Sequence, residues 1–410
     1  MNMTTKTNLQ RVLLIGAGRE GEDLLAEARA MGLRVLNINS KKSFKPAFLP
    51  LVEHAVLIDY EDLDALLPIA RVLAQVYPFN SVISLSEDGL VAAAHVARAL
   101  GLPGSSVDTV ELLKDKARMR AHLARTAISP VVARVGNSGD DIATFFALHG
   151  KAIVKPVDGA GSFAVFTVAA PADAAAAAAG LAAAGIERFL MEEYLDGPEI
   201  SVESFSFDGR HVIVALTDKV VLAHHVEGGH CVPSLLDSAS AAAAGALTCT
   251  FLDAIGLRDG PAHTEIKLTA RGPRIVESHN RVGGDRINEL VRQAYGVSLK
   301  GLALGWAAGV SAALEAPPAP LRAAAIRYLV AEPGVVGAIG GLDAVRALPG
   351  FVELRIDVAC GDTVRPVRCS SDRAGHVIAT GATQAEAIAR CEAMLACIRI
   401  TTSPDAPSCN

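Results

Sequence analysis

The sequence predicts a mixed protein of the α/β and α+β classes, organised in several domains. Strand and helix patterns alternate over the first hundred residues, strand patterns dominate the middle of the chain, and a mixed region follows the Pro-rich segment at 317–320. The chain has 410 residues, which is enough for two or three domains with sizeable cores.

Composition and charge argue against several classes of protein. Lys and Arg number 38 against 44 Asp and Glu, and the net charge of −6 disfavours a protein held on nucleic acid by a global positive field. No apolar window reaches the roughly 18 residues that cross a bilayer, so we expect no membrane anchor. The first ten residues are polar and contain no secretory h-region, which predicts a cytoplasmic protein. The seven cysteines form no C-x-x-C pair, which argues against a zinc ribbon or a disulfide framework and favours reduced thiols.

The N-terminal region begins with a strand–helix–strand pattern. We expect strands at 11–15, 33–38, 55–58 and 81–85 and helices at 20–31, 61–76 and 88–100. Gly16, Gly18 and Gly21 match the G-x-G-x-x-G dinucleotide fingerprint, but Asn37 and Asn39 stand where an acidic ribose ligand is expected. A tight strand-to-helix turn in a Rossmann-like domain is therefore favoured over nicotinamide binding.

The remaining elements suggest a division into domains. We expect helices at 108–124, 173–184 and 383–397 and strands at 152–155, 163–168, 189–194, 200–207, 211–217, 263–268, 274–278, 325–331, 352–357 and 364–369. The predicted domains are a Rossmann-like N-terminal domain, two core subdomains and a mixed C-terminal domain, with the ranges 1–107, 108–188, 189–315 and 316–410.

Two lysines and a glycine-rich loop form a candidate phosphate site. Lys116 lies on a predicted helix, Lys155 stands at what we expect to be an exposed strand end, and a loop with Gly159, Gly161 and Ser162 follows. A polyphosphate needs point positive charges and backbone N–H groups that approach closely, and glycines permit that approach. A solvated helix lysine and an ordinary hairpin are the alternatives.

Two carboxylates on neighbouring predicted strands form a candidate metal site. Glu265 and Glu277 are a pair of hard oxygen donors of the kind that Mg²⁺ prefers. The second strand ends in Glu277-Ser278-His279-Asn280-Arg281. Since strand residues alternate between faces, His279 should face the same side as Glu277 and Asn280 the other side, unless the backbone bulges.

These elements, in this order between residues 115 and 286, resemble the ATP-grasp superfamily of carboxylate–amine ligases. The resemblance implies that Lys116 and Lys155 bind phosphates and that the glycine loop folds over them. It implies a metal site with Glu265 and Glu277, holding Mg²⁺ or alternatively Mn²⁺, with Arg281 at the transferred phosphate. The usual family pattern is Glu-x-Asn-x-Arg, so the third ligand is open between His279, Asn280 and no protein group.

The segment FLMEEYLDGPEISVES (189–204) resembles the adenine hinge of the same superfamily. The resemblance implies that backbone groups of four residues meet the adenine edge, namely Glu192, Glu193, Tyr194 and Leu195. It also implies that Glu199 accepts hydrogen bonds from ribose hydroxyls. Glu203, farther along on the same face, is either a second polar contact or a solvated residue.

The segment HHVEGGHCVP (224–233) is polar and Gly-rich, and we expect a loop. His and Glu clusters suggest zinc, yet no third ligand stands at an established spacing. The segment resembles the Glu-x-x-His substrate loop of the branch that contains bacterial L-amino acid ligases and carnosine synthase-like enzymes. There Glu227 would receive an α-ammonium and His230 would lie beside the activated carboxylate, with a solvated loop as the alternative.

The C-terminal segment 361–387 resembles the closing domain of that branch, with Asp372 and Arg373 at an expected turn. Together the resemblances predict an N-terminal pre-ATP-grasp domain, a split ATP-grasp core and a C-terminal lid. They imply an ATP-dependent ligase that forms an amide, such as a dipeptide, through an acyl phosphate and releases ADP and phosphate. Its partners would be small amino-acid or amine substrates and, as is common for this architecture, a second copy in a homodimer. A biotin- or purine-pathway carboxylase, a non-catalytic nucleotide-binding module and a nicotinamide oxidoreductase are the alternatives.

Overall fold

The N-terminal region folds as a parallel sheet covered on both faces. The computed structural model describes residues 10–18 and 20–403. The sheet has the strand order β3-β2-β1-β4. Its elements are β1 (Arg11–Ile15), α1 (Gly21–Ala30), β2 (Arg34–Asn39), η1 (Pro46–Leu51), β3 (His54–Leu57), α2 (Leu63–Val76), β4 (Ser81–Ile83), η2 (Glu87–Gly89) and α3 (Leu90–Leu100). The predicted helices and strands of this region are confirmed. The inner strands β1 and β2 are almost wholly buried, whereas β3 lies at the edge of the sheet and is partly exposed.

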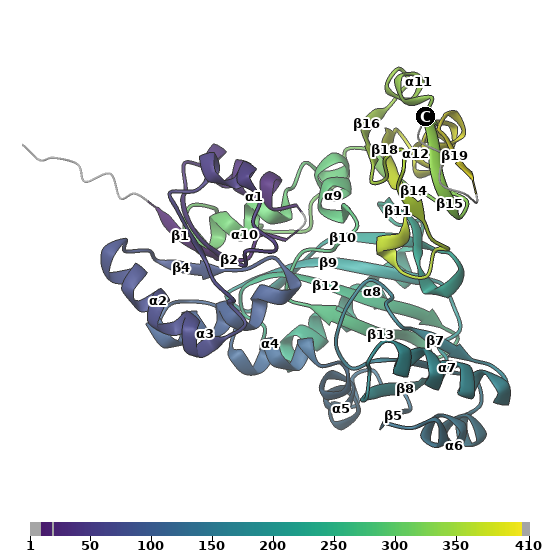
Figure 1. Cartoon of the computed structure of the whole chain (residues 1–410). Coiled ribbons are helices and arrows are strands. Elements are labelled where there is room, and N and C mark those ends of the chain that lie inside the picture. The colour runs from purple at the N-terminus through teal and green to yellow at the C-terminus, as the bar shows by residue number, and fades with distance from the viewer. Residues whose placement is uncertain (1–9, 19, 404–410) are drawn as a thin grey trace, which may run out of the picture.

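One helix from much later in the chain completes this N-terminal layer. α10 (Leu299–Ala308) packs beside α1 on one face of the parallel sheet, while α2 and α3 cover the other face (Figure 1). Leu304 of α10 is fully buried against Val12, Leu14 and Leu25. The core of the chain is therefore fixed to the N-terminal sheet by apolar packing.

A second, antiparallel sheet has the strand order β5-β8-β6-β7. Its elements are β5 (Ala133–Gly136), α6 (Gly139–His149), β6 (Ala152–Pro156), β7 (Phe166–Val168), α7 (Pro171–Ala183) and β8 (Phe189–Glu193), with α6 and α7 packed together on one face. The single helix predicted at 108–124 is wrong, because the chain forms α4 (Val107–Lys114) and α5 (Lys116–Thr126). Asp115 breaks the pattern by accepting hydrogen bonds from the N–H groups of Ala117 and Arg118, which caps α5.

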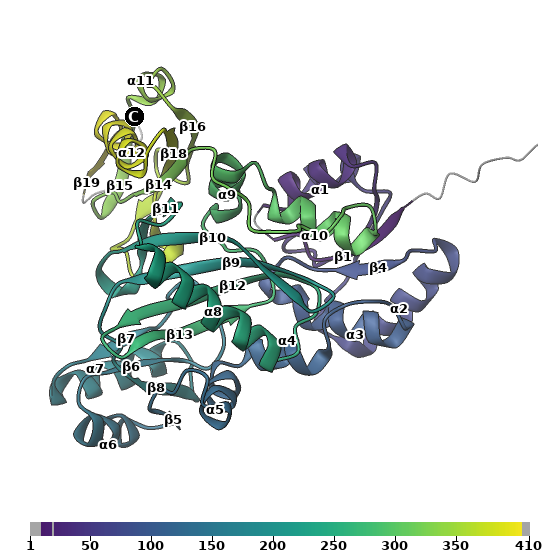
Figure 2. The same cartoon turned by 180° about the vertical axis from the view of Figure 1, so that it is seen from behind.

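The largest sheet has eight strands in the order β13-β12-β9-β10-β11-β14-β18-β16. The first part of this sheet consists of β9 (Glu199–Phe207), β10 (Arg210–Val221), β11 (Glu227–Val232), β12 (Gly260–Thr269) and β13 (Gly272–His279). α8 (Ser238–Ala254) packs against one face and α9 (Ile287–Tyr295) against the other, as the view from behind shows for α8 (Figure 2). The predicted loop at 224–233 is wrong in part, because residues 227–232 form the strand β11 between β10 and β14, whereas the start of the segment lies in η3 (Ala223–His225).

The C-terminal region adds three strands to this same sheet and builds a small one beside it. The added strands are β14 (Ala323–Leu329), β16 (Phe351–Ile356) and β18 (Gly375–Gly381), and α12 (Gln384–Cys397) packs on them. The small sheet has the order β17-β15-β19, made by β15 (Gly334–Gly340), β17 (Thr363–Val364) and β19 (Arg399–Ser403), and the remaining elements are α11 (Leu342–Arg346) and η4 (Ser370–Asp372). The strand predicted at 364–369 is wrong beyond Val364, since the chain turns into η4. The predicted domain boundaries remain predictions.

Among the described residues, no helix is long and apolar enough to span a membrane. Six cysteines lie within the described residues and all are free, while Cys409 and most of the polar N-terminal segment lie outside them.

The packing of α10 on the N-terminal sheet gives a stability prediction. Leu304→Ala should lower the free energy of unfolding by roughly 2 to 5 kcal/mol, because it leaves a cavity in a close-packed cluster. Leu148→Ala on α6, whose side chain is 69% exposed, is the control and should change it by less than about 1 kcal/mol. Denaturant unfolding measures both, and equal midpoints for the two variants would show that α10 does not hold the layers together.

Candidate active site

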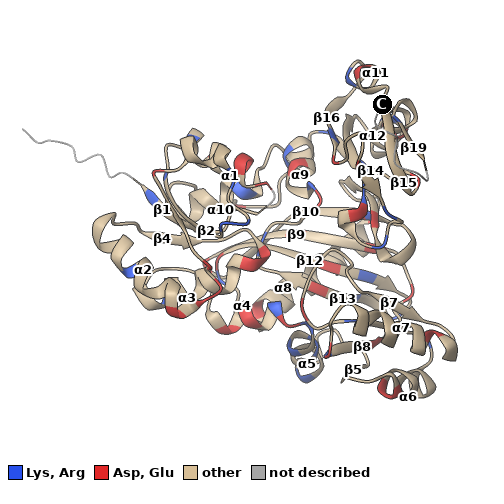
Figure 3. Ribbon diagram, in the orientation of Figure 1, with Lys and Arg blue, Asp and Glu red and all other residues tan. Residues whose placement is uncertain are grey.

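Strands of the two larger antiparallel sheets and residues that follow strands of the N-terminal sheet line one cavity of about 620 Å³. Every residue predicted to belong to the site lines this cavity, except Asn280. The lining also includes the N-terminal turn residues Ala17 and Gly18 and the C-terminal residues Ser370 and Arg373. Acidic and basic residues lie close together along the central strands, as Figure 3 shows around β12 and β13. The cavity is therefore formed by segments that are far apart in the sequence, and its walls are highly charged.

The candidate metal carboxylates lie directly opposite each other. Glu265 on β12 pairs in register with Glu277 on β13. The Nζ of Lys219 lies 2.9 Å from Glu265, and the Nζ of Lys116 lies 3.2 Å from Glu277. Burial is the largest influence and raises the pKa of each carboxyl group, but Lys219 with His263 at Glu265, and Lys116 with His279 at Glu277, together more than offset it and hold both pKa values below the ordinary range. Both carboxylates are thus kept ionised.

A bulge sets the facing of β13. The register between β12 and β13 shifts between the pairs Glu265–Glu277 and Ile266–Ile275, so Val276 is the extra residue. The bulge precedes Glu277, and normal alternation holds after it. The Nε2 of His279 accordingly lies 3.1 Å from the Glu277 carboxylate, whereas Asn280 is outside the cavity lining.

The lysines and the glycine loop form one connected group. Lys116 begins α5, and its Nζ donates a hydrogen bond of 2.6 Å to the carbonyl oxygen of Gly159. Gly159 and Gly161 have φ values of 96° and 71°, which glycine adopts without strain, and Ser162 Oγ donates to the carbonyl of His225. The loop is therefore held at both ends of its glycine pair.

The expected exposure of Lys155 is wrong. Its side chain is 7% exposed and its Nζ lies 2.6 Å from Glu192. Arg120 on α5 makes a second ion pair with the same carboxylate, at 2.5 Å. Burial raises the pKa of Glu192, but Arg120 and Lys155 more than offset this and lower it. The side chain of Glu192 is thus a buried anchor for two cations, which the hinge resemblance did not predict.

The hinge segment leaves β8 at the edge of the cavity. The N–H of Glu193 donates to the carbonyl of Val132, and the N–H of Tyr194 donates to the carbonyl of Lys151. Glu193, Tyr194 and Leu195 all line the cavity. Two of the backbone donors in this segment are therefore already used within the protein.

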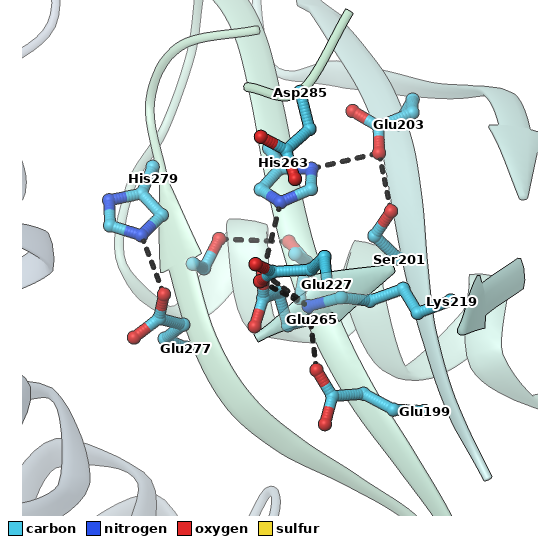
Figure 4. Close-up of polar contacts among 12 residues, drawn as sticks. Glu199, Ser201, Glu203, Lys219, Glu227, His263, Glu265, Glu277, His279 and Asp285 are labelled. Atoms are coloured by element: carbon cyan, nitrogen blue, oxygen red, sulfur yellow. Dashed lines mark hydrogen bonds and ion pairs between the residues drawn. The ribbon is translucent and has the colours of Figure 1, made fainter. Parts of the chain in front are cut away.

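Lys219 on β10 is a central residue that the sequence reasoning missed. Its side chain is 3% exposed, and its Nζ lies 2.6 Å from Glu199, 2.9 Å from Glu265 and 3.6 Å from Glu227 (Figure 4). Three nearby carboxylates outweigh the effect of burial and raise the pKa of Lys219 well above its ordinary value. One ammonium group therefore joins the predicted ribose, metal and substrate carboxylates. The strand predicted at 211–217 ended before Lys219, whereas β10 continues to Val221.

The substrate end of the cavity is a network of ion pairs. Ser370 Oγ donates to the Glu227 carboxylate, at 2.9 Å. The Nε2 of His230 lies 3.2 Å from Asp285, whose two oxygens also accept hydrogen bonds of 2.9 and 2.6 Å from Arg373. Burial raises the pKa of Asp285, but Arg373 and His230 lower it below the ordinary range. Arg373, left undecided by the sequence, thus connects the C-terminal turn to the core, and Asp285 was not predicted.

Glu87, in the short helix η2 of the N-terminal region, was also missed. Its carboxylate lies 2.7 Å from Nε of Arg281 and 3.2 Å from Nδ1 of His279. Burial would raise the pKa of Glu87, but His279, Arg281 and Lys114 lower it below the ordinary range. Spacing along the chain gives no signal for a contact that spans 194 residues.

The residues present fit a hard divalent cation that also binds phosphate. Glu265 and Glu277 face each other in a buried site, and carboxylate oxygens are suitable Mg²⁺ ligands. Within residues 10–18 and 20–403, no group of three or more His, Cys, Asp or Glu side chains is arranged to hold a metal. These side chains therefore supply only part of a coordination shell. Such a site suits a cation that is also coordinated by phosphate oxygens, whereas a structural zinc ion needs four protein ligands.

The glycine fingerprint near the N-terminus forms a turn with an internal partner. The side chain of Asn37 donates hydrogen bonds to the carbonyl oxygens of Leu14 and Gly16. Gly16 and Gly18 have positive φ values, as the tight turn requires. Asn37 thus stabilises the turn, in agreement with the interpretation favoured over nicotinamide binding.

Three family descriptions match separate parts of the chain. The ATP-grasp N-terminal domain matches residues 25–104, the ATP-grasp domain matches residues 149–289, and the L-amino acid ligase C-terminal domain 2 matches residues 327–403.

Named relatives agree with these matches. Carnosine synthase 1 of Gallus gallus is 30% identical over 83% of this chain, and alanine–anticapsin ligase of Bacillus amyloliquefaciens is 26% identical over 57%. The aligned regions span only 41% and 54% of those proteins. The crystal structure of an L-amino acid ligase from Bacillus licheniformis superposes with a TM-score of 0.84 at 23% identity, and covers 96% of this chain and 99% of that one. The chain therefore contains an ATP-grasp domain at residues 149–289, preceded by a match to the ATP-grasp N-terminal domain and followed by a match to the L-amino acid ligase C-terminal domain 2.

Proposed function

We propose that the chain is an ATP-dependent ligase that activates the carboxylate of one amino acid as an acyl phosphate and joins it to the amine of a second substrate. The observation that carries the proposal is that one cavity has cations suited to phosphates at one end and a carboxylate suited to an ammonium group at the other. Lys116, Lys155 and Arg281 supply cations at the first end, and Glu227 supplies an anion at the second. Of the proteins to which the chain is similar, alanine–anticapsin ligase is named for joining two compounds and carnosine synthase for making carnosine.

The proposed nucleotide site uses the cations and the hinge. The adenine would lie against residues 193–195, the ribose near Glu199, and the phosphates between Lys116, Lys155 and the loop with Gly159, Gly161 and Ser162. Point charges and free backbone N–H groups suit a polyphosphate. Glu265 and Glu277 would hold Mg²⁺, for which Mn²⁺ is an alternative, and the cation would neutralise charge on the transferred phosphate.

The proposed chemistry requires positioning more than a protein nucleophile. The oxygen of the substrate carboxylate forms a bond to the γ-phosphorus of ATP, and the bond to the β-phosphate oxygen breaks to give ADP. The amine of the second substrate then attacks the acyl carbon, loses a proton, and expels inorganic phosphate. Arg281 would stabilise the negative charge of the transferred phosphoryl group, and Glu227 would orient the first amino acid through its ammonium. A cytoplasmic location and a homodimer remain predictions.

The reaction itself is the first test. Purified protein with ATP, Mg²⁺ and pairs of amino acids should release ADP and phosphate and form a product whose mass equals the two substrates minus water. A phosphate-release screen followed by mass spectrometry measures both. Release of AMP and pyrophosphate would contradict the mechanism, and ADP release that needs bicarbonate but no amino acid would favour a carboxylase.

The proposed role of Lys116 at the phosphates can be tested by comparing it with Arg118, a second cation on α5. Lys116→Met should lower kcat by roughly 100-fold, because a buried charge directed at the phosphates is lost while the apolar stem is kept. Arg118→Met, in which the replaced side chain is 51% exposed and outside the cavity, is the matched control. If steady-state ADP release falls equally in both variants, Lys116 has no role at the phosphates.

Glu227 and Glu199 form a matched pair, because both carboxylates contact Lys219. Glu227→Gln should raise the half-saturating concentration of the first amino acid by roughly 30-fold or more, since a buried partner of an ammonium is lost. Glu199→Gln should instead raise the KM for ATP. Steady-state kinetics with each substrate varied in turn separates the two effects. Equal changes in both KM values in both variants would refute the division of the cavity into two ends.

A further inference from the structure

A histidine lies two residues away from each of the two candidate metal carboxylates. His263 precedes Glu265 on β12, and His279 follows Glu277 on β13. The two histidines are register partners, as the two glutamates are, and the imidazole rings lie 6.5 Å apart with an angle of 22° between their planes. Two parallel Glu–His pairs thus lie side by side on neighbouring strands (Figure 4).

His263 lies between two carboxylates. Its Nδ1 is 2.8 Å from Glu203, and its Nε2 is 3.4 Å from Glu265. The side chain is 6% exposed, and Glu203 on β9 is fully buried and also accepts a hydrogen bond from Ser201. His263 therefore contacts the candidate metal carboxylate from within the protein and is itself held by a second carboxylate.

His279 repeats this arrangement on the other strand. Its Nε2 is 3.1 Å from Glu277, and its Nδ1 is 3.2 Å from Glu87. The side chain is 5% exposed. Glu87 comes from the N-terminal region and also holds Arg281, so the bridge joins that region to the phosphate end of the cavity.

We infer that His279 is a positioning residue held between Glu87 and Glu277, and not a ligand of the metal. The inference rests on the proposed function, since it concerns the residue at the place of the family's Asn. Each ring nitrogen of His279 faces a carboxylate oxygen of the protein, Nε2 at 3.1 Å and Nδ1 at 3.2 Å, so both nitrogens are already engaged within the protein. Mg²⁺, in addition, prefers oxygen ligands.

Glu265 and Glu277 are the only described side chains left to bind the metal on these two strands, because Asn280 lies outside the cavity lining. Each of them is oriented by a histidine that is in turn fixed by a carboxylate from another element, Glu203 or Glu87. Such supporting contacts usually fix the orientation of metal ligands.

A spectroscopic test uses the unaltered protein. Mn²⁺ with AMP-PNP, an ATP analogue that is not hydrolysed between its β- and γ-phosphates, is bound to the chain, and pulsed electron paramagnetic resonance measures nitrogen coupling to the Mn²⁺. We expect no coupling to a histidine nitrogen. A ¹⁴N coupling that persists in His263→Ala and disappears in His279→Ala would overturn the inference. If Mn²⁺ and AMP-PNP do not bind at all, the proposed function fails together with the inference.

A double-mutant cycle tests the bridge to Glu87. If His279 acts through Glu87 and Glu277, the combined variant Glu87→Gln/His279→Ala should have a kcat within roughly threefold of the worse single variant, because both changes break one connection. If His279 binds the metal independently of Glu87, the two losses should multiply, which would overturn the inference. Thermal unfolding of each variant identifies any loss of folded protein.

A matched control comes from a Glu–His pair outside the cavity. Glu111 lies 3.6 Å from His95, and neither residue lines the cavity. Glu111→Gln should leave kcat and the half-saturating Mg²⁺ concentration within about twofold of the parent. Glu87→Gln should change at least one of them by roughly tenfold. An effect of Glu87→Gln no larger than that of Glu111→Gln would also contradict the inference.

Discussion

The arrangement of the site depends on cations that neutralise two buried carboxylates lying close together. Glu265 and Glu277 face each other across two hydrogen-bonded strands, and two carboxylates taken out of water are stable only with cations close by. Lys219 and Lys116 supply that compensation, one from the neighbouring part of the sheet and one from the start of α5. The positions of β10 and α5 are thus tied to the charge of the site.

The same requirement explains why several layers meet at one cavity. Arg281 is compensated by Glu87 from the N-terminal region, and Arg373 from the C-terminal turn is compensated by Asp285 of the core. The N–H of Ser370 donates to the carbonyl of Gly161, so the C-terminal turn also contacts the glycine loop. Apolar packing of α10 on the parallel sheet holds these charged partners at a fixed separation. A ligase of the proposed type needs such an arrangement, because the acyl phosphate must be kept away from water until the amine arrives.

Much of the fold could be predicted from local patterns, because alternating strands and turn glycines are visible in short stretches of sequence. Lys116, Lys155, Glu265 and Glu277 were predicted from the resemblance of the ordered motifs to the ATP-grasp superfamily, and all four line the cavity. The break at Asp115 was missed because a capping carboxylate inside a helical pattern resembles an ordinary polar residue.

The contacts that were missed have a common physical reason. Glu87 and Arg281 are 194 residues apart, and Arg373 and Asp285 are 88 residues apart. Motif spacing in the sequence therefore does not indicate these two contacts. The segment after residue 226 was expected to be a loop because it is polar and Gly-rich, but a sheet that buries polar side chains around a charged site tolerates such residues in a central strand. The composition of a short segment predicts whether its residues are buried in an apolar core. It does not indicate that polar residues are buried among paired charges.

The central claim is that a substrate carboxylate attacks the γ-phosphorus of ATP within this cavity. Isotope transfer measures that step directly. With the first amino acid labelled with ¹⁸O in its carboxylate, mass spectrometry of the released phosphate should find one ¹⁸O atom for each amide formed, because the oxygen that attacks phosphorus leaves with it. Unlabelled phosphate, formed together with a labelled amide, would contradict an acyl phosphate and with it the account of the site.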